Sequence, residues 1–211
     1  MQKVKVTLLE ITPEHVVNRA ISMPYDSEPS PELTRKVIGI KKHLSCAEHI
    51  VMNFIIEGSS RLELQEHMRH RMASPTVKSS RYTIQKDVAG LDIENLQKLF
   101  VYPDTAQIKD EYAKICFDAI LQEVYDAAYY AMCRCKAAGV PNDFVKYILP
   151  EGLRTSFSWT INLRSFINFL ELRTDVNAHF EIRHIAKLMR EEIGKAKKAA
   201  YVDKILKEMG L

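Results

Sequence analysis

Two segments in which core-type residues alternate with polar ones constrain the fold most strongly. The first spans residues 50–56 and the second spans residues 155–161. Their alternating members are Ile50, Met52, Phe54 and Ile56, and Thr155, Phe157, Trp159 and Ile161. Alternation places every second side chain on the same face of a strand, so each segment reads as a strand with one buried face. Helical patterns surround both strands at irregular intervals, which favours a mixed α/β fold of the α+β type. We expect a central, mostly antiparallel sheet packed with helices.

A long helix is the second feature that the pattern predicts. It covers about Asp104 to Ala138 and is stopped by Gly139 and Pro141. Shorter elements are a strand and a series of helices. The strand covers 3–10, and the helices begin at 14 or cover 31–43, 61–69, 164–173 and 178–194, with one more near the C-terminus. No repeat or linker interrupts the chain, so we expect a single domain over residues 1–211.

Composition limits the possible function classes. The chain has 211 residues, of which 46% are hydrophobic, enough for one sizeable core. Its net charge of +3 mildly favours anionic partners without indicating nucleic acid. No apolar run approaches a membrane span, and no signal peptide is evident, so we expect a cytoplasmic protein. The four cysteines do not suggest a disulfide framework.

The densest chemical signal is Arg69-His70-Arg71, followed by the segment 79–82, which reads Ser-Ser-Arg-Tyr. Guanidinium is a permanent planar cation that matches phosphate and carboxylate oxygens in a bidentate manner. Such a density of cations and hydroxyls favours an anionic ligand, most plausibly a nucleotide phosphate. The alternative is a basic helix end followed by a solvated loop.

Two further polar clusters accompany this segment. One covers 162–173, where amide and guanidinium side chains follow the second core strand, and the other covers 43–49 at a helix end. Taken alone, the first is better explained as a helix N-terminus capped by Asn162 with exposed arginines. The second is better explained as a polar connection in which Ser45 and Glu48 satisfy backbone groups. The chain has no G-x-G-x-x-G and no P-loop lysine motif, so side chains and helix ends must bind any dinucleotide. His67 and His70 share a helical face, but no third metal ligand is evident, so we expect no metal site.

Together the three clusters resemble the flavin-dependent thymidylate synthases. The signature of that family is Arg-His-Arg, seven residues and then Ser, which residues 69–79 satisfy. Residues 43–49 are similar to the family pattern H-x-[ST]-x-x-E-H, and 162–173 match a third family segment in the expected order. The resemblance extends over most of the chain.

The resemblance implies reductive methylation of dUMP to dTMP. It implies 5,10-methylenetetrahydrofolate as carbon donor, FAD reduced by NADPH, and a homotetramer with active sites shared between subunits. The implied FAD-binding residues are Ser45, Arg69, His70, Arg71, Asn162, Arg164 and Asn168. The implied dUMP-binding residues are Glu66, Arg69, Ser79, Ser80, Arg81, Lys146 and Arg173. Arg173 matches the catalytic arginine that favours the ionised uracil N3.

Four positions depart from common family members. Val77 stands where Glu is frequent, Lys146 where Arg is frequent, Glu66 where Gln is frequent and Asn177 where His is frequent. Val77 and Lys146 keep a second hypothesis open, a non-catalytic module that binds flavin or a nucleotide. A third hypothesis is a metal-dependent hydrolase that uses His67 and His70.

Overall fold

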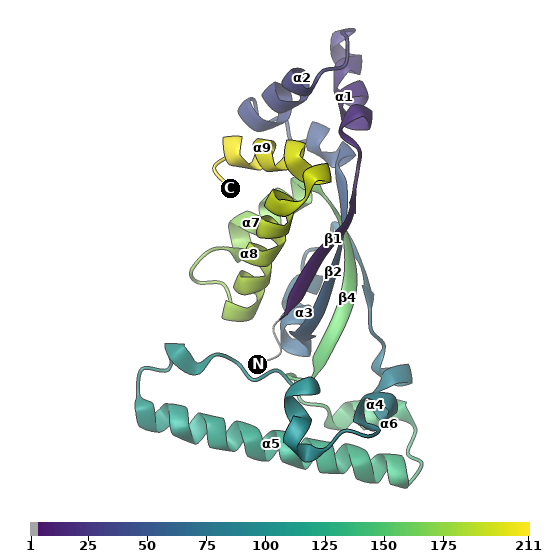
Figure 1. Cartoon of the computed structure of the whole chain (residues 1–211), viewed down its shortest axis with the longest axis vertical. Helices are drawn as coiled ribbons and strands as arrows, with labels where there is room; N and C mark the ends of the chain where they lie inside the picture. The colour runs from purple at the N-terminus through teal and green to yellow at the C-terminus, as the bar shows by residue number, and fades with distance from the viewer. Residues whose placement is uncertain (1–3) are drawn as a thin grey trace. The chain divides into compact units, whose positions relative to one another are not determined.

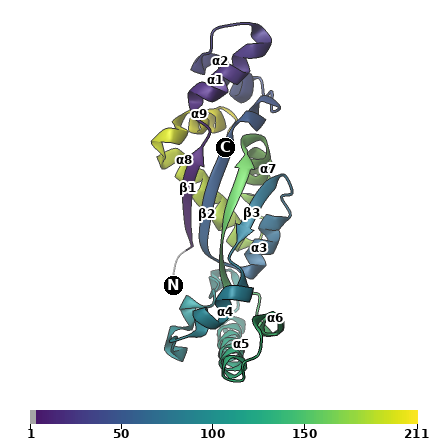
Figure 2. The ribbon, with the colours of Figure 1, turned by 90° about the vertical axis from the view of Figure 1, so that its right-hand side faces the viewer.

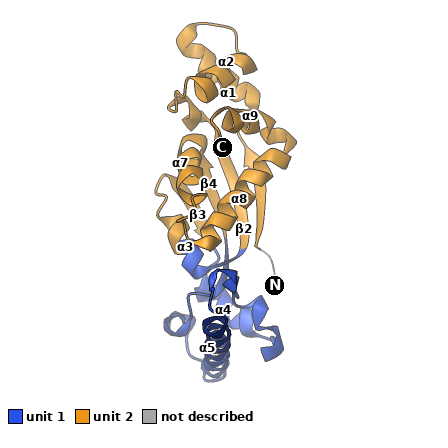
Figure 3. Cartoon of the chain, turned by 90° about the vertical axis from the view of Figure 1, so that its left-hand side faces the viewer, with its two compact units in different colours: residues 1–3, 58–64, 77–156 blue, residues 4–57, 65–76, 157–211 orange. Residues whose placement is uncertain are grey.

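The computed structural model describes residues 4–211, which form two compact units (Figure 3). Within the described part, unit 1 comprises residues 58–64 and 77–156, and unit 2 comprises residues 4–57, 65–76 and 157–211. Each unit is assembled from segments that lie far apart in the sequence, which is why no linker marks a boundary. The expectation of a single domain stays a prediction.

A four-stranded antiparallel sheet organises the chain (Figure 2). Its order is β1-β2-β4-β3, with β1 at Lys5–Ile11, β2 at Val51–Ser60, β3 at Ala73–Val77 and β4 at Arg154–Asn162. Along β4 every second residue is buried, from Thr155 to Ile161, as the alternation predicted. The mixed α/β class and the antiparallel sheet are therefore confirmed.

Helices of unit 2 cover the sheet. α8 packs against β1, and α7 packs against α8 (Figure 1). The helices of this unit are α1 (Glu14–Ser22), α2 (Pro31–Arg35), α7 (Leu163–Arg173), α8 (Phe180–Lys195) and α9 (Ala200–Glu208). The helix α3 (Arg61–Met68) begins in unit 1 and ends in unit 2. The apolar side chains of α7 and α8 that face the sheet and each other are buried. Their burial stabilises the packing of α7 against its neighbours.

Unit 1 has its own apolar core around Phe100, Tyr125 and Met132. Its helices are α4 (Ser80–Val88), α5 (Glu111–Ala137) and α6 (Asn142–Val145). The prediction of one helix over 104–138 was wrong at its start. The Asp110 side chain accepts a hydrogen bond from the Ala113 backbone N–H at 2.7 Å, which begins α5 seven residues late.

Other boundaries also differ from expectation. Residues 105–107 form a separate 3₁₀ turn, and α2 is followed by one π-helical turn that ends at Ile40 instead of His43. β2 extends beyond the expected segment to Ser60, and Gly58 takes a positive φ of 82° within it. The residues between Arg71 and Ser79, where no strand was expected, contain β3. No helix among residues 4–211 is long and apolar enough to cross a membrane.

Candidate functional site

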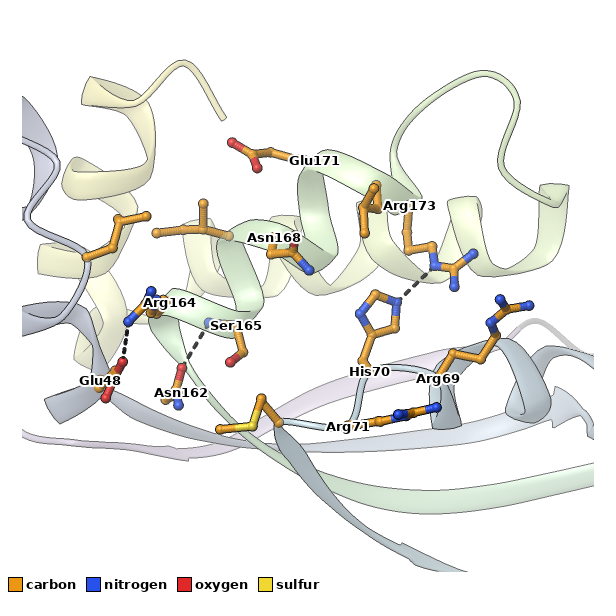
Figure 4. A pocket seen from close by; sticks show the side chains of 14 residues that line it. Glu48, Arg69, His70, Arg71, Asn162, Arg164, Ser165, Asn168, Glu171 and Arg173 are labelled. Atoms are coloured by element: carbon orange, nitrogen blue, oxygen red, sulfur yellow. Dashed lines mark hydrogen bonds and ion pairs between the residues drawn. The ribbon is translucent and has the colours of Figure 1, made fainter.

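A pocket of about 730 Å³ in unit 2 collects most of the predicted site residues (Figure 4). Its polar and charged lining residues are Glu48, Arg69, His70, Arg71, Asn162, Arg164, Ser165, Asn168, Glu171 and Arg173. Arg69, His70, Arg71 and Arg173 gather at one end, and Glu48, Asn162 and Arg164 gather at the other. This volume is typical of sites for small ligands and cofactors.

The Arg-His-Arg segment lies where α3 ends and before β3 begins. The backbone N–H of Arg69 donates to Glu66 O at 3.4 Å, and that of His70 donates to His67 O at 3.1 Å. These bonds close the last turn of α3 and release the chain, so that Arg69 and Arg71 lie exposed at the pocket. Neither arginine has a carboxylate partner within the described part of the chain. Both guanidiniums are therefore available to an anionic ligand.

Aromatic side chains pack against the two histidines at the Arg69–Arg71 end of the pocket. The ring centroid of His67 lies 4.7 Å from that of Trp159 and 5.1 Å from that of Phe169. His70 contacts the same Phe169 ring edge-on at 4.9 Å. His67 is completely buried among these rings, so it belongs to the core and is not placed as a metal ligand. Among the described residues, no group of three or more His, Cys, Asp or Glu side chains could hold a metal ion.

Arg173 is held by three acceptors. Its Nε donates to His70 Nε2 at 2.9 Å, its Nη1 donates to a Glu66 carboxylate oxygen at 2.8 Å, and its Nη2 donates to Glu66 O at 3.4 Å. The Arg173 side chain is only 16% exposed, so solvent screens this arrangement weakly. Arg173, predicted as the catalytic cation, thus shares the pocket with Arg69 and Arg71.

His70 is neutral at physiological pH. Burial and, next, the Arg173 guanidinium lower the pKa of His70 from 6.5 to about 4. A neutral ring with Nε2 accepting from Arg173 must carry its proton on Nδ1, because only one ring nitrogen of neutral imidazole is protonated. The ring therefore offers one N–H donor, at Nδ1, for further contacts.

The lowered pKa of His70 predicts a pH dependence of stability. The unfolded chain protonates His70 near pH 6.5 and the folded chain near pH 4, so protonation favours the unfolded state and the free energy of unfolding falls as the pH falls through this window. After allowance for solvent screening of a half-exposed ring, we expect a loss on the order of 1 kcal/mol. Urea unfolding of the wild type and of His70→Gln between pH 7 and 4 measures it. Parallel pH profiles of the two proteins would contradict the assignment.

The start of α7 forms the other end of the pocket. The Asn162 side-chain oxygen accepts from the Ser165 backbone N–H at 2.9 Å and caps the helix, which leaves the Asn162 amide N–H₂ group for a ligand. Arg164 pairs with Glu48 at 2.6 Å, so its charge is partly balanced. Asn168, one turn further on, is exposed and lines the pocket.

A second pocket, of about 350 Å³, lies in unit 1 and contains other predicted residues. Ser79, Ser80 and Lys146 line it, and so does Val77, whose side chain has no polar atom. Ser79 and Ser80 begin α4, whose N-terminus carries partial positive charge, and the Ser79 hydroxyl makes no capping bond. Cationic side chains beside a helix N-terminus form a setting that suits a phosphate.

The structure places the three remaining predicted residues outside both linings. Glu66 accepts from Arg173, as described above. Arg81 forms an ion pair with Asp143 of α6 at 2.9 Å, and both side chains are 56% exposed. Ser45 is exposed beside Leu44, which does line the pocket of unit 2. The pairing of Glu48 and Asp143 with arginines was not predicted, because pairing across distant segments leaves no local pattern in a sequence.

The fold and the larger pocket define a mixed α/β protein with a cationic site suited to a nucleotide. Residues 7–197 match the family model described as thymidylate synthase complementing protein. The flavin-dependent thymidylate synthase of Wolinella succinogenes is 34% identical over 203 residues, which cover 90% of this chain and 93% of that protein. That of Pyrococcus furiosus is 32% identical, covering 91% and 80%. The chain therefore belongs to the flavin-dependent thymidylate synthase family.

Solved structures agree with this assignment. A crystal structure of thymidylate synthase X from Helicobacter pylori with FAD and dUMP has a TM-score of 0.76 and 28% sequence identity, covering 96% of this chain and 99% of that one. A second Helicobacter pylori structure, complexed with FAD and dUMP, has a TM-score of 0.75 and 30% identity, with coverage of 92% and 97%.

Proposed function

We propose that this protein synthesises dTMP from dUMP by reductive methylation, with 5,10-methylenetetrahydrofolate as carbon donor and NADPH as reductant of FAD. The observation that carries the proposal is one pocket in which Arg69, His70 and Arg71 meet Arg173. The family relatives named above support it. The Helicobacter pylori structures, described as containing FAD and dUMP, support both ligands.

The pocket of unit 2 fits a flavin dinucleotide in its chemistry. A flavin presents a planar ring with several acceptor atoms and a pyrophosphate with negative charge. Arg69 and Arg71 supply cations without carboxylate partners within residues 4–211, and Asn162 and Asn168 supply amide groups. We assign these residues, with Ser45, His70 and Arg164, to FAD. When bound, the flavin would supply hydride transfer.

We assign the base of dUMP to Arg69 and Arg173, with Glu66 held on Arg173 beside them, and the phosphate to Ser79, Ser80, Arg81 and Lys146. A fixed guanidinium beside uracil N3 stabilises the ring anion and so lowers the pKa of N3. Ionisation of N3 raises electron density at C5, where the new carbon–carbon bond forms. Arg173 would hold the negative charge at N3 during this step.

A homotetramer with shared active sites completes the proposal. The assigned dUMP residues other than Glu66 and Arg81 fall in two separate pockets of the chain. The long helix α5 supports association. This helix has 27 residues, of which only Tyr125 and Met132 are buried. Ile115 and Ile120 on the same helix are 60% and 59% exposed. Apolar side chains exposed in this number mark an interaction surface.

The visible absorption spectrum of the purified protein separates this proposal from a colourless protein. We expect a yellow protein with the spectrum of oxidised flavin, or one that acquires it when FAD is added. A protein that binds flavin but oxidises no NADPH would favour the alternative of a non-catalytic flavin-binding module. A protein that cannot take up added FAD would contradict both readings.

Lys146→Ala tests the phosphate assignment. Removal of one cation from the pocket of unit 1 should weaken dUMP binding about tenfold, because a hydrogen bond to a charged group contributes roughly 1.5–3 kcal/mol. Calorimetric titration with dUMP measures the change. Lys136→Ala, an exposed lysine of α5 outside this pocket, is the matched control. Equal dUMP affinity of the wild type and Lys146→Ala would remove Lys146 from the phosphate site.

A further inference from the structure

The Arg173 guanidinium is already engaged on one side. A guanidinium has five N–H groups. One donates to His70, one to the Glu66 carboxylate and one to the Glu66 backbone oxygen. The remaining N–H groups lie one on each terminal nitrogen, and they are the ones left for a ligand. The fork that Arg173 presents is therefore set by its partners.

Glu66 accepts two of the three hydrogen bonds that orient the Arg173 guanidinium. Its side chain is 31% exposed and is fixed on the last turn of α3, whereas Arg173 comes from the last turn of α7. The ion pair of 2.8 Å joins the two helix ends. Other charged or titratable groups at this point are Arg69 and the two histidines, His67 and His70. Glu66 is the carboxylate that faces Arg173 among the described residues.

We propose that Glu66 is a positioning residue that acts on dUMP through Arg173, by fixing the plane of the guanidinium, and not as a direct ligand of the nucleotide. This inference rests on the proposed function. The acceptor atom, and not the negative charge, is then the property that matters. A charge at this position opposes ionisation of uracil N3, because a carboxylate disfavours a second anion nearby.

Two substitutions separate position from charge. Glu66→Gln and Glu66→Ala remove the same negative charge, but only glutamine keeps an oxygen that can accept from Arg173 Nη1. We expect Glu66→Gln to keep kcat and dUMP affinity within about threefold of the wild type. Glu66→Ala should lower kcat about ten- to hundredfold, the equivalent of one charge-assisted hydrogen bond, while FAD affinity and Tm change little.

A double-mutant cycle shows whether Glu66 acts through Arg173. The variant that combines Glu66→Ala with Arg173→Ala should be no less active, and bind dUMP no more weakly, than Arg173→Ala alone. Additive losses would show an independent contact with dUMP and overturn the inference. Equal losses in Glu66→Gln and Glu66→Ala, or none in either, would also overturn it.

A ligand-free crystal structure of Glu66→Ala gives a readout that is independent of activity. We expect the Arg173 side chain to leave His70 or to become disordered, and to keep its place in Glu66→Gln. Arg173 unmoved in Glu66→Ala would overturn the inference without affecting the proposed function. Wild-type protein that binds no dUMP and forms no dTMP would instead sink the proposed function.

Discussion

Arg173→Ala is expected to lower dTMP formation by about two to three orders of magnitude, because a preorganised cation that stabilises developing negative charge contributes roughly this much to kcat. FAD binding should weaken only a few-fold, since Arg69 and Arg71 keep their charges at the same end of the pocket. Turnover with saturating dUMP and flavin fluorescence titration measure the two effects. Their ratio is the informative quantity.

Two controls make the Arg173 result specific. Arg19→Ala removes an exposed arginine of α1 outside the pocket and should leave both properties unchanged. Arg173→Lys keeps the charge but loses the planar fork, so it should fall between the wild type and the alanine variant. Parallel loss of flavin binding and activity in Arg173→Ala would show that Arg173 is structural.

Trp159→Ala is expected to be the most destabilising single change near the site. Trp159 is 1% exposed, and its ring lies 4.7 Å from that of His67 and 5.0 Å from that of Phe169. Loss of a buried aromatic side chain leaves a cavity and costs about 3–5 kcal/mol of unfolding free energy. The same rings pack against His70, which accepts a hydrogen bond from Arg173. Because Arg173 is assigned to dUMP, dUMP affinity should fall as well. Urea denaturation measures the free energy.

The control for Trp159→Ala is a large apolar side chain on the surface. Met23→Ala removes a residue that is 62% exposed, and it should change the unfolding free energy by no more than about 0.5 kcal/mol. A loss below about 1 kcal/mol in Trp159→Ala would show that the rings around His67 contribute little. These rings would then not be what holds His70 and its end of the pocket in place.

The sequence predicted the two central strands correctly because their burial is periodic. β4 alternates without exception from Thr155 to Ile161, and no helix produces that pattern. It could not predict β3, whose five residues include Pro75 and contain no buried side chain. Pairing in the sheet determines that strand, and a single sequence does not display its partners.

The long helix was predicted in the right place, but its predicted start lies too early in the chain. Asp104 and Asp110 both have the side chain that caps a helix, and both do so in the structure. Asp104 begins only a 3₁₀ turn, which ends before Asp110 begins α5. Two good caps in close succession cannot be ranked from local preferences alone.

The candidate site was also predicted only in part from the sequence. The density of fixed cations in Arg69-His70-Arg71 was visible in the sequence, and their place in a pocket with Asn168 and Arg173 follows from the structure. The partners that tune these groups were not visible. Glu66, expected beside the nucleotide, accepts a hydrogen bond from Arg173. Glu48, expected to satisfy backbone groups of a connection, pairs with Arg164. Such pairs join segments that only the fold brings together.

The most direct test of the central claim is tritium release from dUMP labelled at C5. Purified protein supplied with FAD, NADPH and 5,10-methylenetetrahydrofolate should release tritium and form dTMP. Release should stop when NADPH or 5,10-methylenetetrahydrofolate is omitted, and flavin-free protein should release none until FAD is added. A folded, flavin-loaded protein that binds dUMP, yet releases no tritium and forms no dTMP in the complete mixture, would contradict the account.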